Sequence, residues 1–154
     1  MRRPLSSAKP ETIIKRAQQL CAERDLRLTE QRMAVLRLIS ESEKPVTAYD
    51  LLEKMREVVK NPAPPTVYRA LDFLLEHGLI HKIESLHAYV GCDHPDHPHA
   101  GQFLICSDCG EVNEVEDQEV SKTLNDAGKS IGFHTTRPIV ELMGVCAQCY
   151  DKRK

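Results

Sequence analysis

Hydrophobic positions in the first half of the chain recur three or four residues apart, the spacing of helices with one buried face. Four segments show this pattern, at about residues 12–24, 30–40, 48–59 and 65–75. Thr29 and Thr47 stand where a side chain can cap the second and third helices, because threonine accepts hydrogen bonds from a first turn. The prolines before residue 66 favour a helix start, and Gly78 suits its end. The pattern therefore predicts four helices, with Leu36, Leu51 and Leu71 among the buried positions.

The pattern changes after Gly78. Residues 79–84 and 88–91 are short runs rich in β-formers, and Ser85-Leu86-His87 separates them, as in a β-hairpin. Helices followed by a two-stranded hairpin are typical of a winged helix-turn-helix domain. In such a domain the third helix would be the support and the fourth would lie in the major groove of DNA.

A second, smaller unit is predicted after residue 100. Strands are expected at residues 102–106, 111–116 and about 139–143, with an amphipathic helix before the last of them. The apolar face of that helix contains Val120, Leu124, Ala127 and Ile131. The overall prediction is an α+β protein with a winged-helix domain at 1–92, a hinge at 93–100 and an α/β dimerisation domain at 101–154. A core so small is rarely stable without a metal or a partner subunit.

Composition and charge narrow the class of protein. The chain is 41% hydrophobic and 29% charged, as expected for a soluble globular protein. It has no apolar run of about 20 residues and no signal-peptide pattern, so we expect a cytoplasmic protein with no membrane partner. Residues 1–90 contain 15 basic and 12 acidic residues, a net charge of +3, whereas residues 91–154 contain 6 and 11, a net charge of −5. This asymmetry favours two modules with different partners, although +3 alone is weak evidence for nucleic acid.

Two Cys-x-x-Cys pairs give the strongest chemical signal. They are Cys106-Ser-Asp-Cys109 and Cys146-Ala-Gln-Cys149, separated by 36 residues. Four thiolates form a closed tetrahedral zinc site of the structural kind. The alternatives are buried thiols or a redox pair, but neither pair is expected to begin a helix after a βαβ strand, as a thioredoxin-like pair does.

A second set of candidate ligands flanks the hinge: His81, Cys92, His99 and Glu114. Nitrogen, sulfur and oxygen ligands together suit zinc, and a thiolate argues against magnesium. Because the ligands come from both predicted domains, a metal bound there would fix the orientation of the DNA-binding domain. The competing interpretation is a polar, solvated hinge with one partly buried cysteine. His94 and His97 belong to either a weaker third site or a surface loop.

Several motifs resemble the ferric uptake regulator family. They are Thr29-Glu-Gln-Arg32, Pro65-Thr-Val-Tyr-Arg69-Ala-Leu71 and the paired Cys-x-x-Cys, and the similarity covers about residues 12–149. The segments Ala48–Leu52, Pro64–Leu75 and Ala88–Cys92 are similar to the zinc-sensing members. Two departures weaken an iron-sensing interpretation: His97-Pro98-His99 replaces a His-His-Asp-His run, and Pro138 stands where those members have a histidine ligand.

The resemblance implies a homodimer that binds double-stranded operator DNA when zinc is plentiful and represses zinc-uptake genes. It implies two zinc ions per subunit. The structural ion would lie on Cys106, Cys109, Cys146 and Cys149, and the regulatory ion on His81, Cys92, His99 and Glu114. Contacts to DNA would come from Tyr49, Tyr68 and Arg69, since an arginine fork can bind the O6 and N7 atoms of guanine. Basic residues such as Arg32 and Lys82 could contact phosphates.

Three other functions compete with this one. The first is an iron- or peroxide-responsive regulator of the same fold, against which the Cys92 thiolate argues. The second is a zinc store that never contacts DNA, against which the predicted helix at 65–75 argues. The third is an enzyme, but the chain has no His-Glu-x-x-His motif, no glycine-rich phosphate loop and no nucleophile elbow. The sequence therefore predicts a regulator and not an enzyme.

Overall fold

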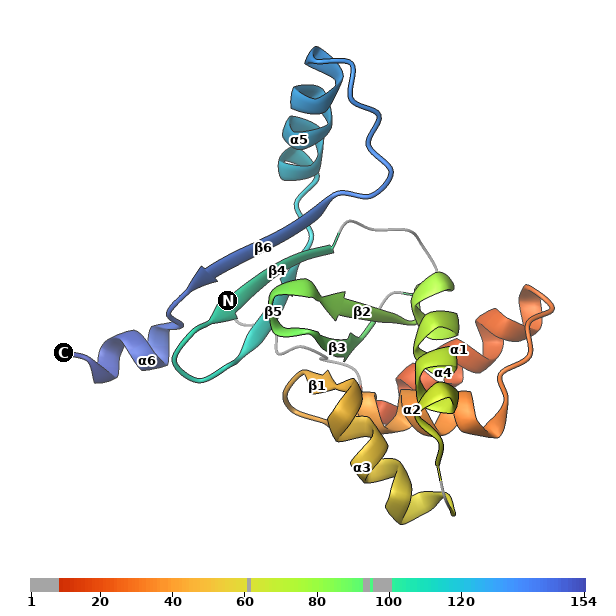
Figure 1. Ribbon diagram of the computed structural model, residues 1–154. Coiled ribbons are helices and arrows are strands. Elements are labelled where there is room, and N and C mark those ends of the chain that lie inside the picture. The colour runs from red at the N-terminus through yellow and green to blue at the C-terminus, as the bar shows by residue number, and fades with distance from the viewer. Residues whose placement is uncertain (1–8, 61, 93–94, 96–100) are drawn as a thin grey trace. The chain divides into compact units, whose positions relative to one another are not determined.

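The computed structural model describes residues 9–60, 62–92, 95 and 101–154. These residues divide into two compact units, one containing 9–92 and the other 101–154 (Figure 1). The expected hinge at 93–100 lies outside the described residues except for Pro95, so the predicted domain boundaries stay a prediction. Within the described part of the chain, every helix is too short or too polar to cross a bilayer.

The first unit is a winged helix-turn-helix. Its elements are α1 (Pro10–Glu23), α2 (Glu30–Glu41), β1 (Val46–Thr47), α3 (Ala48–Val58), α4 (Pro64–Glu76), β2 (Ile80–Ile83), the 3-10 turn η1 (Glu84–Leu86) and β3 (Ala88–Gly91). All four predicted helices and the hairpin are confirmed. Strand β1 was not predicted; it pairs antiparallel with β3, so the sheet order is β1-β3-β2.

Local hydrogen bonds explain where the helices begin and end. The Thr29 hydroxyl accepts from the backbone N–H of Arg32 at 3.3 Å, as the sequence predicts. Thr47 accepts from the N–H of Asp50 at 3.1 Å, while the Asp50 carboxylate accepts from the N–H of Thr47 at 3.4 Å. These two bonds form a capping box that starts α3. After α4, Gly78 has a φ of 71°, a left-handed conformation that glycine adopts without strain.

A continuous hydrophobic core fills the first unit. Leu36, Leu51 and Leu71, which the periodicity predicts to be buried, are no more than 1% exposed. They belong to one cluster to which all four helices and the small sheet contribute. This unit therefore buries the apolar faces that its own sequence provides, and α4 is fixed on it through Val67, Ala70 and Leu74.

The second unit is a small α/β module, drawn in Figure 1 from cyan to blue. Its elements are β4 (Gly101–Cys106), β5 (Val112–Val115), α5 (Gln118–Ser130), β6 (Ile139–Gly144) and α6 (Ala147–Lys152). Strand β4 is central, with β5 antiparallel on one side and β6 parallel on the other. The three predicted strands and the helix are confirmed.

Helix α6 corrects one expectation from the sequence. Cys146 is its N-cap residue and Cys149 lies in its first turn, so the second Cys-x-x-Cys pair does begin a helix after a strand. The extended backbone of Cys146 (φ −66°, ψ 160°) is the N-cap conformation of α6, and Ala147 and Gln148, both good helix formers, start the first turn. The expectation that neither pair begins a helix was therefore wrong for this pair.

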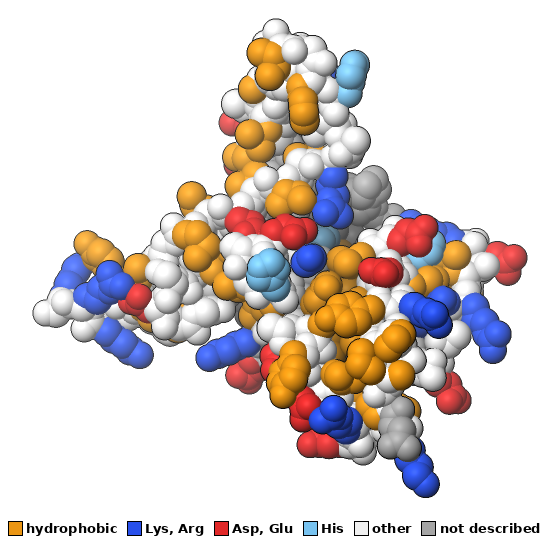
Figure 2. Space-filling model, viewed as in Figure 1, with side chains coloured by type: hydrophobic (Ala, Val, Ile, Leu, Met, Phe, Trp, Pro, Cys, Tyr) orange, Lys and Arg blue, Asp and Glu red, His pale blue; other side chains and the backbone are white. Residues whose placement is uncertain are grey.

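Helix α5 is fixed at its N-terminal end. The buried Gln102 side chain donates to the carbonyl of Asp117 at 2.8 Å and to the Ser121 hydroxyl at 2.9 Å, and accepts from the N–H of Asp117 at 3.1 Å. Yet no residue of α5 is buried. Figure 2 shows hydrophobic side chains at the surface along this helix, and Leu124 is 45% exposed. The sequence predicts the amphipathic helix, but its apolar face is uncovered in the single chain.

Candidate metal centre and nucleic-acid interface

The fold brings the two Cys-x-x-Cys pairs together. Cys106 ends β4 and Cys109 lies in the following turn, whereas Cys146 and Cys149 stand at the start of α6. Because β4 and β6 are parallel neighbours with Cys106 opposite Gly144, both pairs lie at the same end of the sheet. The four sulfur atoms lie within 4.8 Å of one another, the only such cluster of three or more metal-ligand groups among the described residues.

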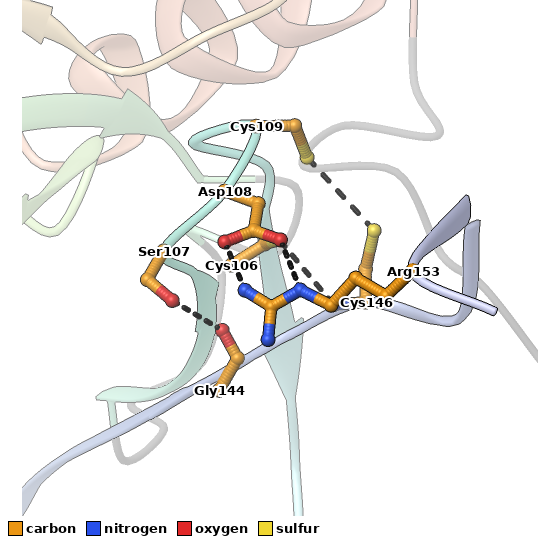
Figure 3. A network of polar contacts seen from close by, with 7 residues as sticks. All are labelled: Cys106, Ser107, Asp108, Cys109, Gly144, Cys146 and Arg153. Atoms are coloured by element: carbon orange, nitrogen blue, oxygen red, sulfur yellow. Dashed lines mark hydrogen bonds and ion pairs between the residues drawn. The ribbon is translucent and has the colours of Figure 1, made fainter. Parts of the chain in front are cut away.

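The spacing of the sulfur atoms fits zinc. A tetrahedral ion with Zn–S bonds of ~2.3 Å places its sulfurs about 3.8 Å apart. The Cys109 and Cys146 sulfurs are 3.9 Å apart and point toward each other (Figure 3). Four soft sulfur donors at this distance suit a closed zinc site and leave no coordination position for water.

The charge balance of the cluster also favours a cation. The backbone N–H of Cys146, which donates to the Cys106 sulfur at 3.3 Å, is the main reason that the pKa of Cys106 is lowered to about 6. Hydrogen bonding with the Cys146 thiol, with burial adding to it, raises the pKa of Cys149 to about 12. The first thiol of the cluster thus loses its proton readily, whereas loss of further protons is opposed. A divalent ion removes that opposition, because its charge stabilises all four thiolates.

A network outside the ligands joins the two pairs, and it was not predicted from the sequence. The Arg153 guanidinium donates from Nε and Nη2 to the two carboxylate oxygens of Asp108, at 2.9 and 2.6 Å. The backbone N–H and the hydroxyl of Ser107 both donate to the carbonyl of Gly144, at 2.8 and 3.0 Å. Figure 3 shows these contacts between the turn of the first pair and the segment that carries the second. Asp108 and Arg153 are 45 residues apart in sequence, so no local pattern signals their contact.

The second predicted metal site is described only in part. His81 lies on β2 opposite Val90, and the N–H of Cys92 donates to the carbonyl of Leu79 at 3.2 Å. This register places the half-buried His81 and the fully buried Cys92 on one face of the hairpin. The half-buried Glu114 is on β5 of the other unit. His99 lies outside the described residues, as do His94 and His97, so the four-residue site stays a prediction.

The three predicted DNA contacts are on the surface of the first unit. Tyr49 in the first turn of α3 is 71% exposed, and Tyr68 on α4 is 54% exposed. Arg69 is also exposed, whereas its neighbours on the core face of α4 are buried. All three side chains are therefore available to a partner, and their role at DNA stays a prediction.

Two of the basic residues considered for phosphate contacts have partners within the chain. The Arg32 guanidinium lies over the ring of Phe73, 3.8 Å from its centre, and donates to the carbonyl of Arg27. Lys82 is 3.5 Å from the carboxylate of Glu84. The contact between Arg32 and Phe73 links α2 to α4, which favours a structural role for this arginine.

Known proteins resemble this chain over most of its length. The model of the ferric uptake regulator family matches residues 23–143. The zinc uptake regulation protein of Escherichia coli (strain K12) is 42% identical over 142 residues, which is 92% of this chain and 83% of the relative. A solved structure of a zinc uptake regulator complexed with zinc and DNA matches with a TM-score of 0.90 at 40% identity, covering 96% of this chain and 99% of that one. The holo form of XcZur matches with a TM-score of 0.85 at 45% identity, covering 91% and 98%.

Proposed function

Because the chain belongs to the ferric uptake regulator family, we propose that it is a zinc-responsive DNA-binding repressor. As a zinc-loaded homodimer it binds double-stranded operator DNA and represses genes for zinc uptake, acting in the cytoplasm. The observation that carries this proposal is a winged helix with Tyr68 and Arg69 exposed on α4, in a chain that also holds four sulfurs at zinc-binding distance. The relatives named for zinc uptake regulation support the same conclusion.

The DNA-binding half of the proposal rests on α4. Its core face is held by Val67, Ala70 and Leu74, so Arg69 projects from a fixed position. A guanidinium on a recognition helix can donate two hydrogen bonds to guanine, and a tyrosine can contact a thymine methyl group or a phosphate. We assign base contact to Arg69 and supporting contacts to Tyr68 and Tyr49.

The metal-binding half distinguishes two zinc ions per subunit. Cys106, Cys109, Cys146 and Cys149 hold the structural ion, which stabilises the second unit. His81, Cys92, His99 and Glu114 hold the regulatory ion. His81 and Cys92 precede residues 93–100, His99 lies within this segment, and Glu114 follows it. Zinc at this second site selects the arrangement in which both recognition helices of a dimer reach DNA, and so raises DNA affinity.

A second copy of the chain is the proposed occupant of the exposed apolar surface of the second unit. Helix α5 buries no residue, and β6 exposes Leu142 and Met143 to 61% and 51%. Exposed hydrophobic surface on this scale is typical of an interface between subunits. We therefore propose that residues 101–154 form the dimer.

Two other functions are less well supported. A four-sulfur site leaves no position for a reacting water, which argues against a zinc enzyme. An iron- or peroxide-responsive regulator would favour harder ligands than the Cys92 thiolate. Metal analysis of protein purified without added metal separates the zinc from the iron alternative.

Selection from random duplexes tests the proposal directly. The zinc-loaded full chain should enrich a defined sequence. A gel shift on that duplex should be lost when a chelator removes the regulatory zinc. Arg69→Ala should cost about 1–3 kcal/mol on the selected duplex and relax the preference at one base pair. Binding without sequence enrichment, or enrichment that does not depend on zinc, would contradict the proposed repressor.

Glu114→Ala tests the regulatory site. The variant should remain a folded dimer with one zinc per subunit, yet bind the selected duplex without a response to zinc. Glu116→Ala, two positions along the chain from Glu114, is the matched control and should behave like the wild type. If Glu114→Ala keeps the full zinc response, the regulatory ligand set is wrong.

A further inference from the structure

The contact between Asp108 and Arg153 is the strongest feature that the proposed function does not use. Asp108 lies between the two cysteines of the first pair, and Arg153 ends the helix that carries the second pair. The guanidinium donates from two nitrogens to the two oxygens of one carboxylate, at 2.9 and 2.6 Å. This two-point contact fixes direction as well as distance, which a single hydrogen bond does not.

Helical spacing explains how Arg153 reaches the first pair. Arg153 follows Cys149 by four residues, and residues four apart lie on the same face of a helix. The face of α6 that presents the Cys149 sulfur to the cluster therefore also presents the arginine to the turn at residues 106–110. Figure 3 shows the Arg153 side chain reaching across to Asp108 beside the cysteines.

Apart from the contact between the Cys109 and Cys146 sulfurs, the other cross-links described between the two pairs involve backbone groups. Ser107 donates twice to the carbonyl of Gly144, and the N–H of Cys146 donates to the Cys106 sulfur. These contacts tie the end of β6 to the first pair, whereas the Arg153–Asp108 pair ties the far end of α6 to it. Arg153 therefore restrains the helix on which Cys149 lies.

We propose that Arg153 is a positioning residue for the four-cysteine site, where it holds Asp108 and slows the loss of the metal. The proposal rests on the zinc site assigned above. For zinc to leave, one zinc–sulfur bond must break and the freed cysteine must move away before the bond forms again. With α6 tied to the first turn, Cys149 has little freedom to move away, so the bond closes again more often. Without the Arg153–Asp108 contact, zinc release is faster.

The rate of zinc release tests this proposal without reference to DNA binding. Zinc-loaded full chain is mixed with excess 4-(2-pyridylazo)resorcinol, and the absorbance of its zinc complex is followed. The relevant phase is the one that Cys149→Ser abolishes. Exposed ion pairs of good geometry have modest strength, so Arg153→Ala and Asp108→Ala should each speed this phase about two- to fivefold. Arg153→Lys, which keeps the charge but loses the fork, should fall between wild type and Arg153→Ala.

Two further variants separate positioning from charge. Lys152→Ala removes one positive charge from the same helix and should release zinc at the wild-type rate. The double variant Asp108→Ala/Arg153→Ala should release zinc no faster than either single variant, because both remove the same contact. Three outcomes would each overturn the proposed role of the Arg153–Asp108 contact. Lys152→Ala could speed zinc release as much as Arg153→Ala does, the effects could multiply in the double variant, or Arg153→Ala could release zinc at the wild-type rate. A wild-type chain that carries no zinc on these cysteines would overturn the metal site as well.

Discussion

The two units bury their hydrophobic side chains to very different degrees. In the first unit, all four helices contribute to one core. Among its described residues, only Tyr49, Val58 and Tyr68 are large apolar side chains that stay exposed. In residues 101–154, the buried apolar residues of the described chain are Phe103, Ile105, Cys106 and Val112. Ten large apolar residues there are exposed: Leu104, Val115, Val120, Leu124, Ile131, Phe133, Ile139, Leu142, Met143 and Tyr150.

This difference separates two ways of stabilising a small module. The first unit gains its stability from burial of its own side chains. The second unit has too little core for its size, and modules of about 50 residues are usually completed by a metal or by a partner. The sulfur cluster and the apolar surface correspond to these two supports. We therefore expect the stability of the second unit to depend on a bound metal and a partner subunit, and that of the first unit to depend on neither.

Cys146→Ser should have the largest effect and should be confined to the second unit. Structural zinc in small peptides contributes roughly 10–16 kcal/mol of metal-linked folding energy, much of which the loss of one thiolate removes. We expect zinc content to fall by one ion per subunit, amide exchange in β4 and β6 to become fast, and the dimer to dissociate in sedimentation. Gln148→Ala, in the same pair but without a metal ligand, is the control. A well-folded dimer of Cys146→Ser without that zinc would show that the second unit does not depend on the metal for its stability.

Leu36→Ala should act in the opposite half. Leu36 is fully buried in the first core, and truncation of such a leucine costs about 2–5 kcal/mol. Amide exchange of the zinc-loaded protein, measured at increasing urea concentration, should show weaker protection in α1 to α4 and unchanged protection in β4 to β6. Zinc on the four cysteines should stay at the wild-type level. Equal loss of protection in both units would mean that they do not unfold independently.

Leu124→Glu tests whether the second support is a partner subunit. Leu124 is 45% exposed, and covering that surface in both copies of a dimer contributes about 2 kcal/mol at the usual value for a buried leucine. The dimer dissociation constant should therefore rise at least about 30-fold, measured by sedimentation across protein concentration. Asn125→Glu adds the same charge away from the apolar face of α5 and should leave the constant near that of the wild type. Equal weakening by both variants would show a charge effect and not a lost contact.

Thr47→Ala should have the smallest effect. It removes the capping box at the start of α3, and an N-cap of this kind contributes about 1 kcal/mol. Because Tyr49 lies in that first turn, affinity for the selected duplex should also fall slightly. Thr47→Ser keeps the hydroxyl and should restore stability in urea unfolding. If Ser and Ala behave alike, the Thr47 hydroxyl does not contribute to stability.

The sequence predicted the fold where local signals were strong. Helical periodicity predicted α1 to α4, and Thr29 and Thr47 marked helix starts that the structure confirms. Strand β1 was missed because two residues, Val46 and Thr47, carry no alternating pattern. Helix α6 was missed because its six residues are too few to show a periodic face.

For the site, the sequence predicted the four sulfur ligands from their spacing alone. It did not predict the Arg153–Asp108 contact, because only the parallel pairing of β4 with β6 brings these residues together. The apolar face of α5 was visible in the sequence, but what covers it was not. Periodicity shows which side of a helix is apolar and does not identify the surface that packs on it.

The parallel pairing of β4 with β6 has a consequence for chain entropy. Bringing Cys106 and Cys109 against Cys146 and Cys149 closes a loop of 36 residues. Loop closure of that length costs the disordered chain about 4 kcal/mol. Strand pairing and metal binding both require this closure, so whichever forms first spares the other the same cost. Each process therefore raises the equilibrium constant of the other by about three orders of magnitude, and the coupling is equal in both directions. Zinc binding therefore stabilises the pairing of β4 with β6 as much as that pairing raises the affinity for zinc.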